Sequence, residues 1–201
     1  MLFDIARDLM VSLSALVASI LAFLGLNAWR RQLRGTTEYQ IALKTLKAIY
    51  ALRESITEAR GRFEAAPHPG EAQNGTSAES EVLRAARSYR LRLTRVSECR
   101  ADLLRTEQEA LAAWGEQARD ALTGLVLAVD ELFTTCDLYF DDEVTRARKK
   151  DSEGKDLGPG ANDVAMYHTL YSGQDHDKDP FAKRIARSGS QAEEFYRAKL
   201  K

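Results

Sequence analysis

Histidine and cysteine are the residue types of this chain that most readily support catalysis or metal binding. His68, His168 and His176 have no partner at the spacing of a helical metal motif such as H-E-x-x-H. Cys99 and Cys136 lie far apart in the sequence, and in a reducing compartment we expect two free thiols at core or boundary positions. These residues therefore predict neither a metal site nor a disulfide.

A short acidic run looks like the start of a calcium-binding loop. Asp175, Asp177 and Asp179 follow a D-x-D-x-D pattern. A calcium loop also needs glycine at its sixth position and glutamate at its twelfth, where this chain has Pro180 and Ala186. We therefore expect a solvated loop that ends in a helix cap at Asp179.

Other catalytic patterns are missing from the sequence. There is no phosphate-binding G-x-x-x-x-G-K-[ST] segment, and the glycines at 158 and 160 follow a helix rather than a strand. No nucleophile-elbow motif occurs. Glu107, Glu109 and Glu116 lack the E-x-x-H spacing of a di-iron bundle. The sequence predicts no catalytic residue, no metal, no cofactor and no small-molecule substrate.

The composition is typical of a helical protein. Of the 201 residues, 44 % are hydrophobic and 29 % are charged, and four prolines are few for an all-β domain. The 29 Lys and Arg nearly balance the 30 Asp and Glu. Without Asp4, Arg7 and Asp8, residues 30–201 have 28 basic and 28 acidic side chains, which is a poor footprint for nucleic-acid binding.

The first 29 residues differ from the rest. No charged residue occurs from Leu9 to Trp29, a stretch long enough to span about 30 Å of hydrocarbon as a helix. Trp29 has the character of an interfacial residue, and Arg30, Arg31 and Arg34 follow it. The positive-inside rule places these arginines in the cytoplasm, beside the lipid, and the amino terminus outside. A cleaved signal peptide is the less favoured alternative, because the residues before the stretch are acidic.

Small residues recur along this predicted span. Ser14, Ala18 and Ala22 lie four positions apart, a spacing that lets two helices approach closely. Self-association of the span along this face is one interpretation of the spacing. The alternative, which we favour, is that these small side chains simply face lipid.

Residues 30–150 are predicted to form a cytoplasmic bundle of three long helices. The first follows a kink at Gly35, is capped by Thr37 and Gln40, and ends near Arg60. The second begins at a capping box of Thr76 and Glu79, after a loop at 64–78. The first apolar stripe comprises Tyr39, Ala42, Leu43, Leu46, Ile49, Tyr50, Ile56 and Phe63. The second comprises Val82, Ala86, Tyr89, Leu93, Val96, Leu103, Ala110 and Trp114, and the third Leu122, Leu125, Val129, Leu132, Cys136 and Phe140.

The second and third helices are predicted to form an antiparallel hairpin. Gly115 follows Trp114 and suits a helix end, although one long helix through Gly115 is the alternative. The segment from Arg84 to Arg105 is basic, and the segment from Asp130 to Glu143 is acidic. A chain reversal at Gly115 pairs Arg100 with Asp130, Arg92 with Asp137 and Arg87 with Glu143. We interpret the basic segment as structural rather than as a binding patch.

Residues 151–201 are predicted to form a linker and short helices that dock on the bundle. The proposed caps are Asn162, Asp179 before Pro180, and a third capping box of Ser190 and Glu193. The fold class is thus all-α, with a transmembrane helix at 1–29, a coiled-coil-like bundle at 30–150 and a docked tail at 151–201.

The layout resembles a loose class of uncharacterised bacterial inner-membrane proteins with a single span and a helical cytoplasmic domain. The matching residues are Trp29, Arg31, Gln32, Leu33, Gly35, Tyr39, Ala42, Leu46, Tyr50, Arg53, Arg60, Trp114, Gly115, Leu125 and Leu132. The resemblance implies a location in the bacterial inner (plasma) membrane and no known activity.

Two functions remain as expectations. The first is a non-enzymatic scaffold or adaptor whose partners are membrane lipid and another protein or a second copy of the chain. The alternative is a membrane effector or sensor, for example in a stress or phage response, that acts through self-association of the span.

Overall fold

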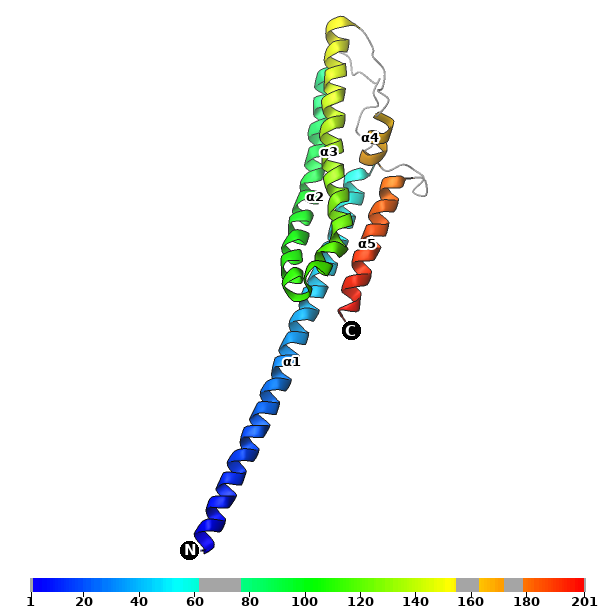
Figure 1. The fold of residues 1–201 in the computed structure, drawn as a ribbon. Coiled ribbons are helices and arrows are strands. Elements are labelled where there is room, and N and C mark those ends of the chain that lie inside the picture. The colour runs from blue at the N-terminus through cyan, green and yellow to red at the C-terminus, as the bar shows by residue number, and fades with distance from the viewer. Residues whose placement is uncertain (1, 62–76, 155–162, 172–178, 201) are drawn as a thin grey trace. The chain divides into compact units, whose positions relative to one another are not determined.

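The computed structural model describes residues 2–61, 77–154, 163–171 and 179–200, with every side chain in those ranges except those of residues 2–15, 17 and 164. The helices are α1 (Leu2–Arg60), α2 (Ala78–Trp114), α3 (Glu116–Glu153), α4 (Asp163–Leu170) and α5 (Pro180–Ala198) (Figure 1). No strand occurs in these ranges, so the predicted all-α class is confirmed. The chain divides into two compact units, Met1–Ile41 and Ala42–Lys201.

Helix α1 continues through Gly35 without interruption. The predicted kink and helix start at Thr37 are therefore wrong. The Thr37 hydroxyl donates to the Leu33 carbonyl at 2.9 Å, as a threonine within a helix does. A single glycine between good helix formers costs only about 1 kcal/mol, which is too little to end a long helix.

None of the helices, as far as their residues are described, is long and apolar enough to cross a membrane. The described residues therefore give no support to the predicted span Leu9–Trp29. Several of its side chains, those of residues 9–15 and 17, lie outside the described residues.

The second unit is a four-helix bundle. Ion pairs between α1 and α2 join Lys44 to Glu109 and Glu58 to Arg95, so these helices run in opposite directions. Helices α2 and α3 form the antiparallel hairpin, and α5 packs against α3. The Tyr196 hydroxyl donates to the Ala118 carbonyl at 2.9 Å, whereas Arg184 pairs with Glu131, so α5 is antiparallel to α3. The predicted three long helices are thus joined by a fourth.

The core follows the predicted stripes closely on α2 and α3. Every predicted residue of the α3 stripe is buried, whereas Val82 and Trp114 of the α2 stripe are only half-buried. On α1, Tyr39 and Tyr50 are exposed, and Phe63 lies outside the described residues. The buried residues of α1 are Ala42, Thr45, Leu46, Ile49, Leu52, Ser55, Ile56, Ala59 and Arg60.

The chain reversal at Gly115 is confirmed. Gly115 has φ +70° and ψ −160°, a backbone conformation that is open essentially to glycine alone. Its amide donates the last i→i−4 hydrogen bond of α2, to the Leu111 carbonyl, and its positive φ then ends the helix. The hairpin therefore depends on a residue without a Cβ at this position.

Charge pairing across the hairpin follows the prediction in part. Arg100 pairs with Asp130 at 2.7 Å, as expected. Asp137 pairs with Arg90 rather than Arg92, because Arg92 turns toward α1 and donates to the Gly61 carbonyl. Glu143 pairs with Arg146, one turn along its own helix, instead of with Arg87.

The helix ends also correct several caps. Ser77 caps α2, since its hydroxyl accepts from the Ser80 amide, and the predicted cap Thr76 lies outside the described residues. Helix α3 extends to Glu153 and ends at left-handed Gly154. Asp179 caps α5 as predicted, but α5 passes through Ser190, so the third capping box is wrong. The proposed cap Asn162 lies outside the described residues.

Candidate functional site

The carboxylates of Glu107, Glu109 and Glu116 do not form a metal or acid–base cluster. Glu109 pairs with Lys44, whereas Glu107 and Glu116 both bind Arg119. Across the described part of the chain, no three His, Cys, Asp or Glu side chains come together as metal ligands. The acidic run at 175–178 and the glycines at 158 and 160 lie outside the described residues.

The thiols and imidazoles do not meet either. Cys136 is buried in the core, and this burial raises the pKa of its thiol to about 11, which keeps the sulfur protonated and unreactive. Cys99 is half-buried, and both cysteines are free. His168 is exposed on α4, and its backbone carbonyl accepts a hydrogen bond from Arg60. His68 and His176 are outside the described residues.

Aromatic residues gather where α2 and α3 meet Tyr171, which directly follows α4. The Tyr89 ring contacts the rings of Phe140 and Tyr171, at centroid distances of 5.8 and 5.5 Å. The Tyr89 hydroxyl donates to the Leu170 carbonyl at 2.7 Å. Burial raises the pKa of Tyr171 to about 12 and that of Tyr89 further, so these phenols act as neutral packing groups.

The basic stretch of α2 is largely paired with acidic groups of the same bundle. Arg90 and Arg100 bind Asp137 and Asp130 of α3, and Arg95 binds Glu58 of α1. This pairing supports the interpretation of the stretch as structural. Arg87 is exposed, however, and no ion pair connects it to the described residues.

A buried arginine joins three helices. The Arg60 guanidinium, 4 % exposed, lies 2.7 Å from the Asp179 carboxylate at the start of α5. It also donates to the carbonyls of Thr169 and His168 at the end of α4, at 2.8 Å each, and stacks on the Phe181 ring. Because these donors are directed at an anion and at helix-end carbonyls, Arg60 is a positioning residue of the bundle.

Two further arginines attach the carboxyl-terminal segment. Arg53 of α1 pairs with Glu193 of α5, beneath Gly189, where an added Cβ would lie 2.7 Å from the Arg53 Cδ. Arg146 of α3 pairs with Asp163, a buried residue at the start of α4. Helices α4 and α5 are thus attached by charged side chains as well as by apolar contacts.

A shallow groove of about 490 Å³ lies between α3 and α5. It is lined by Asp120, Ala121, Gly124, Ser188, Gln191, Glu194 and Phe195. The helices approach closely here, because a Cβ on Gly124 would lie 2.8 Å from the Ser188 hydroxyl. No histidine, cysteine or lysine lines the groove, so it offers little for nucleophilic chemistry.

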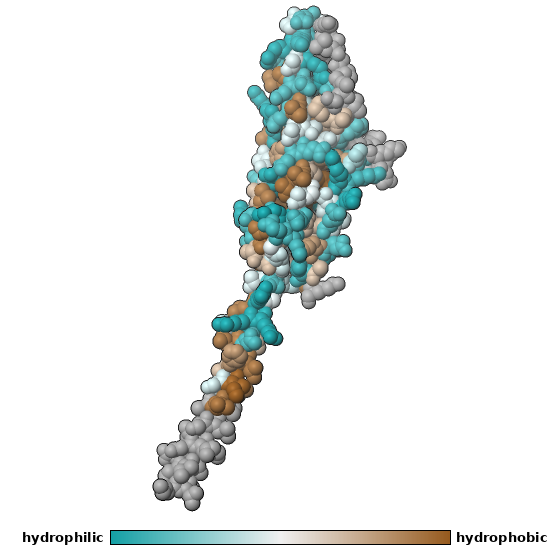
Figure 2. All heavy atoms as spheres, in the orientation of Figure 1, coloured by the Kyte–Doolittle hydropathy of each residue, from teal (hydrophilic) through white to brown (hydrophobic). Residues whose placement is uncertain are grey.

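The residues predicted to contact lipid lie on α1, in the unit Met1–Ile41. Trp29 is 58 % exposed, and Arg30, Arg31 and Arg34 are exposed as well. Figure 2 shows a hydrophobic band along this unit, followed by hydrophilic side chains. Arg34 pairs with Glu38 one turn later at 2.8 Å.

On the predicted self-association face, Ala18 and Ala22 are exposed. The side chain of Ser14 is outside the described residues. The lipid-contact and self-association roles of these residues stay predictions.

No protein-family model, curated protein or solved structure matches this chain.

The sequence predicts that the tail docks on the bundle, but it does not identify the side chains that attach it. Arg60 is predicted only as a helix end and, with Arg53, as part of the resemblance, although both arginines reach α5. The signal for Arg60 was its position near an apolar helix end, where a charge needs a partner. The partner, Asp179, was identified only as a cap.

Proposed function

We propose that this protein is a non-enzymatic, membrane-tethered scaffold or adaptor that presents its helical bundle to a protein partner. One observation carries the proposal: the charged side chains buried in the bundle, notably Arg60 with Asp179, join helices to one another. Polar groups in an active site are instead directed at open space for a substrate.

The exposed surface of the hairpin supports the same proposal. Leu91 is 74 % exposed and Leu138 is 56 % exposed, among charged neighbours. Apolar side chains with polar surroundings are typical of protein-binding surfaces. A long bundle with such a surface suits binding better than catalysis.

We place the tether at Leu9–Trp29, in the bacterial inner membrane with the bundle in the cytoplasm. Within this segment Leu16, Leu21 and Phe23 are 59, 63 and 70 % exposed. An apolar helix that is exposed to this extent needs an environment other than water. Trp29 and Arg30, Arg31 and Arg34 supply the interfacial anchors at the lipid headgroups.

The test is a pull-down of the full chain with a carboxyl-terminal tag from membranes solubilised with native lipid. We expect a stoichiometric protein partner and recovery of the chain in the membrane fraction. Leu91→Glu should weaken recovery of this partner, whereas the control Ala121→Glu in the α3–α5 groove, away from the exposed hairpin leucines, should not. Recovery of the chain from the cytosolic fraction would overturn the tether, and the lack of any partner would overturn the adaptor.

A second candidate function is an effector that acts through self-association of the amino-terminal helix. It is favoured by Ala18 and Ala22, which are both exposed on α1 at four-residue spacing. Replacing both with leucine should abolish self-association, because backbones can then no longer approach. Ser12→Leu, at a position off this face, is the control. Unchanged self-association would refute the effector proposal.

A further inference from the structure

One surface of the bundle has both signs of charge and two exposed leucines. On α2 it presents Arg87 and Leu91, and on α3 it presents Leu138 and Asp141. We call these four residues the hairpin face. All are exposed, and Figure 2 shows hydrophobic patches among hydrophilic side chains over these helices.

The Arg90–Asp137 ion pair fixes the level of the four residues along the hairpin. It crosses from α2 to α3 at 3.1 Å, and both side chains are largely exposed. Leu91 directly follows Arg90, and Leu138 directly follows Asp137. Each step turns a helix by about 100°, so the leucines flank the seam at nearly one level, one on each helix.

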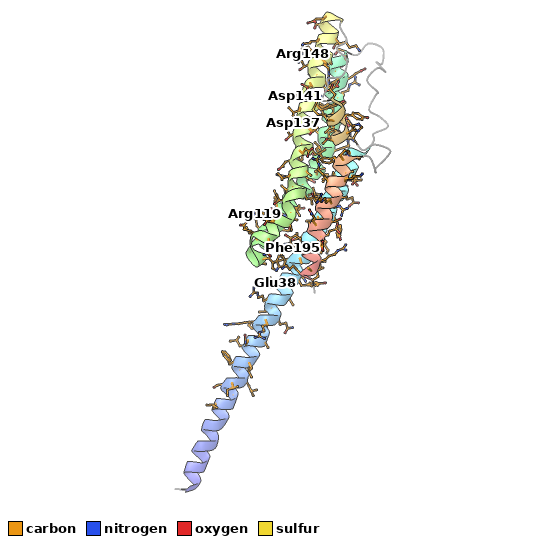
Figure 3. The ribbon with its side chains drawn as sticks, turned by 45° about the vertical axis from the view of Figure 1, so that its right-hand side comes forward. Glu38, Arg119, Asp137, Asp141, Arg148 and Phe195 are labelled. Carbon is orange, nitrogen blue, oxygen red and sulfur yellow. The ribbon has the colours of Figure 1, made fainter. Side chains whose placement is uncertain are left out.

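The two charges of the face occupy the next turn. Arg87 precedes Arg90 by three positions, and Asp141 follows Asp137 by four, so each lies on the same side of its helix as the ion-paired residue. Figure 3 shows Asp137 and Asp141 along one side of α3. In the antiparallel hairpin, Arg87 and Asp141 are again nearly level. Neither forms an ion pair with any described residue.

We propose that the hairpin face binds the hairpin face of a second copy of this chain. A two-fold axis parallel to the hairpin places α2 of each copy over α3 of the other, at the same level. Arg87 of each copy then meets Asp141 of the other, and Leu91 meets Leu138. Each contact occurs twice, as a two-fold interface requires. Because it names the partner of the scaffold, this inference rests on the proposed function.

A second copy fits this face better than an unrelated protein because the face complements itself. A purely basic or purely acidic face would repel its own copy. Here the basic group lies on one helix and the acidic group on the other, and a two-fold rotation exchanges the helices. The leucines provide the apolar contact that the charges orient.

The first test reverses the charges of Arg87 and Asp141 in the full chain. The dissociation constant of the dimer is measured by analytical ultracentrifugation in neutral detergent at low salt. Arg87→Glu and Asp141→Arg should each weaken the dimer about tenfold or more, because each variant places like charges together twice. The double variant R87E/D141R should restore it.

Matched controls exist on the same bundle. Asp120→Arg makes the same charge change as Asp141→Arg on the same helix, at an exposed position about 30 Å away along α3. Arg187→Glu matches Arg87→Glu on α5, where Arg187 is exposed without an ion pair to a described residue. Both should leave the dimer within about twofold of the original chain. Helical circular dichroism verifies the folding of every variant.

The second test determines the register. In a chain with Cys99→Ser and Cys136→Ala, tagged L91C is mixed with untagged L138C under mild oxidation. We expect the disulfide-linked product to be the mixed dimer, because Leu91 meets Leu138 and not another Leu91. Equal linking of like variants would refute the two-fold arrangement.

The outcomes separate this inference from the proposed function. A monomer in all conditions, or a dimer that R87E and D141R leave intact, refutes the hairpin-face dimer. If the pull-down still recovers a stoichiometric partner, the scaffold proposal stands. A dimer that responds to the charge exchange, in a chain from which the pull-down recovers no other protein, supports the inference and leaves the second copy as the partner of the scaffold.

Discussion

The buried pair of Arg60 and Asp179 allows a double-mutant test of what attaches α5. Asp179→Asn removes the negative charge but preserves the helix cap, because an asparagine oxygen can still accept from the Ala182 amide, now 2.9 Å from Oδ1. Arg60 is then a buried cation without its anion. Breaking such a pair costs about 3–5 kcal/mol.

We expect the lower end of that range for Asp179→Asn, about 3 kcal/mol, because Arg60 retains its hydrogen bonds to Thr169 and His168. Arg60→Met loses those bonds as well and leaves a buried carboxylate, so its cost is about 4 kcal/mol. The double variant Arg60→Met with Asp179→Asn buries neither charge. Its free energy of unfolding should therefore fall by about as much as that of one single variant. The coupling energy is therefore about 3 kcal/mol.

Amide hydrogen exchange of α5 measures how much each variant destabilises the attachment of this helix. A loss of 3 kcal/mol should speed exchange of the protected α5 amides on the order of a hundredfold, while the core of α2 changes less. Asp120→Asn, the same substitution at an exposed position, is the control. Additive effects of the two single variants would show that the charges do not depend on each other, and the reasoning would be wrong.

Three further predictions concern the thiols, the turn and alkaline pH. At pH 8 only about one Cys136 side chain in a thousand is a thiolate, so a thiol reagent should modify buried Cys136 far more slowly than half-buried Cys99. Equal modification rates of the two cysteines in the folded chain would contradict the burial of Cys136. Gly115→Ala should lower the free energy of unfolding by about 1–3 kcal/mol, which appears as a melting temperature several degrees lower. An unchanged melting temperature would mean that the turn accommodates a Cβ without strain. Burial raises the pKa of Tyr171 from 10.0 to about 12, so the neutral phenol contributes fully to folding stability below pH 10, and this contribution is lost as pH rises through about 12. A melting temperature that stays constant between pH 10 and pH 12 would refute this prediction.

The sequence predicts this fold best where a pattern repeats. The heptad steps of Leu122, Leu125, Val129 and Leu132 identify a buried face because many residues report the same direction. Gly115 is a strong signal because a change of chain direction demands a backbone angle that other residues avoid. Both signals are local.

Sequence analysis is weaker where one residue has several uses. Thr37 and Ser190 satisfy capping patterns, but helix continuation on both sides outweighs a cap worth about 1 kcal/mol. Arg92 was assigned to Asp137 by level alone, whereas a long side chain near the helix edge can turn toward α1 instead. The partner of Arg60 lies 119 positions later, and no periodic pattern specifies contacts at that distance.

The attachment of α5 has a consequence for the order of events during synthesis. The residues that bind α5, Arg53 and Arg60, leave the ribosome early, and their partners Glu193 and Asp179 follow 140 and 119 positions later. Helices α2 and α3 can form their hairpin in between, since their contacts are close in sequence. During that interval the site for α5 on the nascent bundle is uncovered, and a chaperone that shields apolar surface would find its target there.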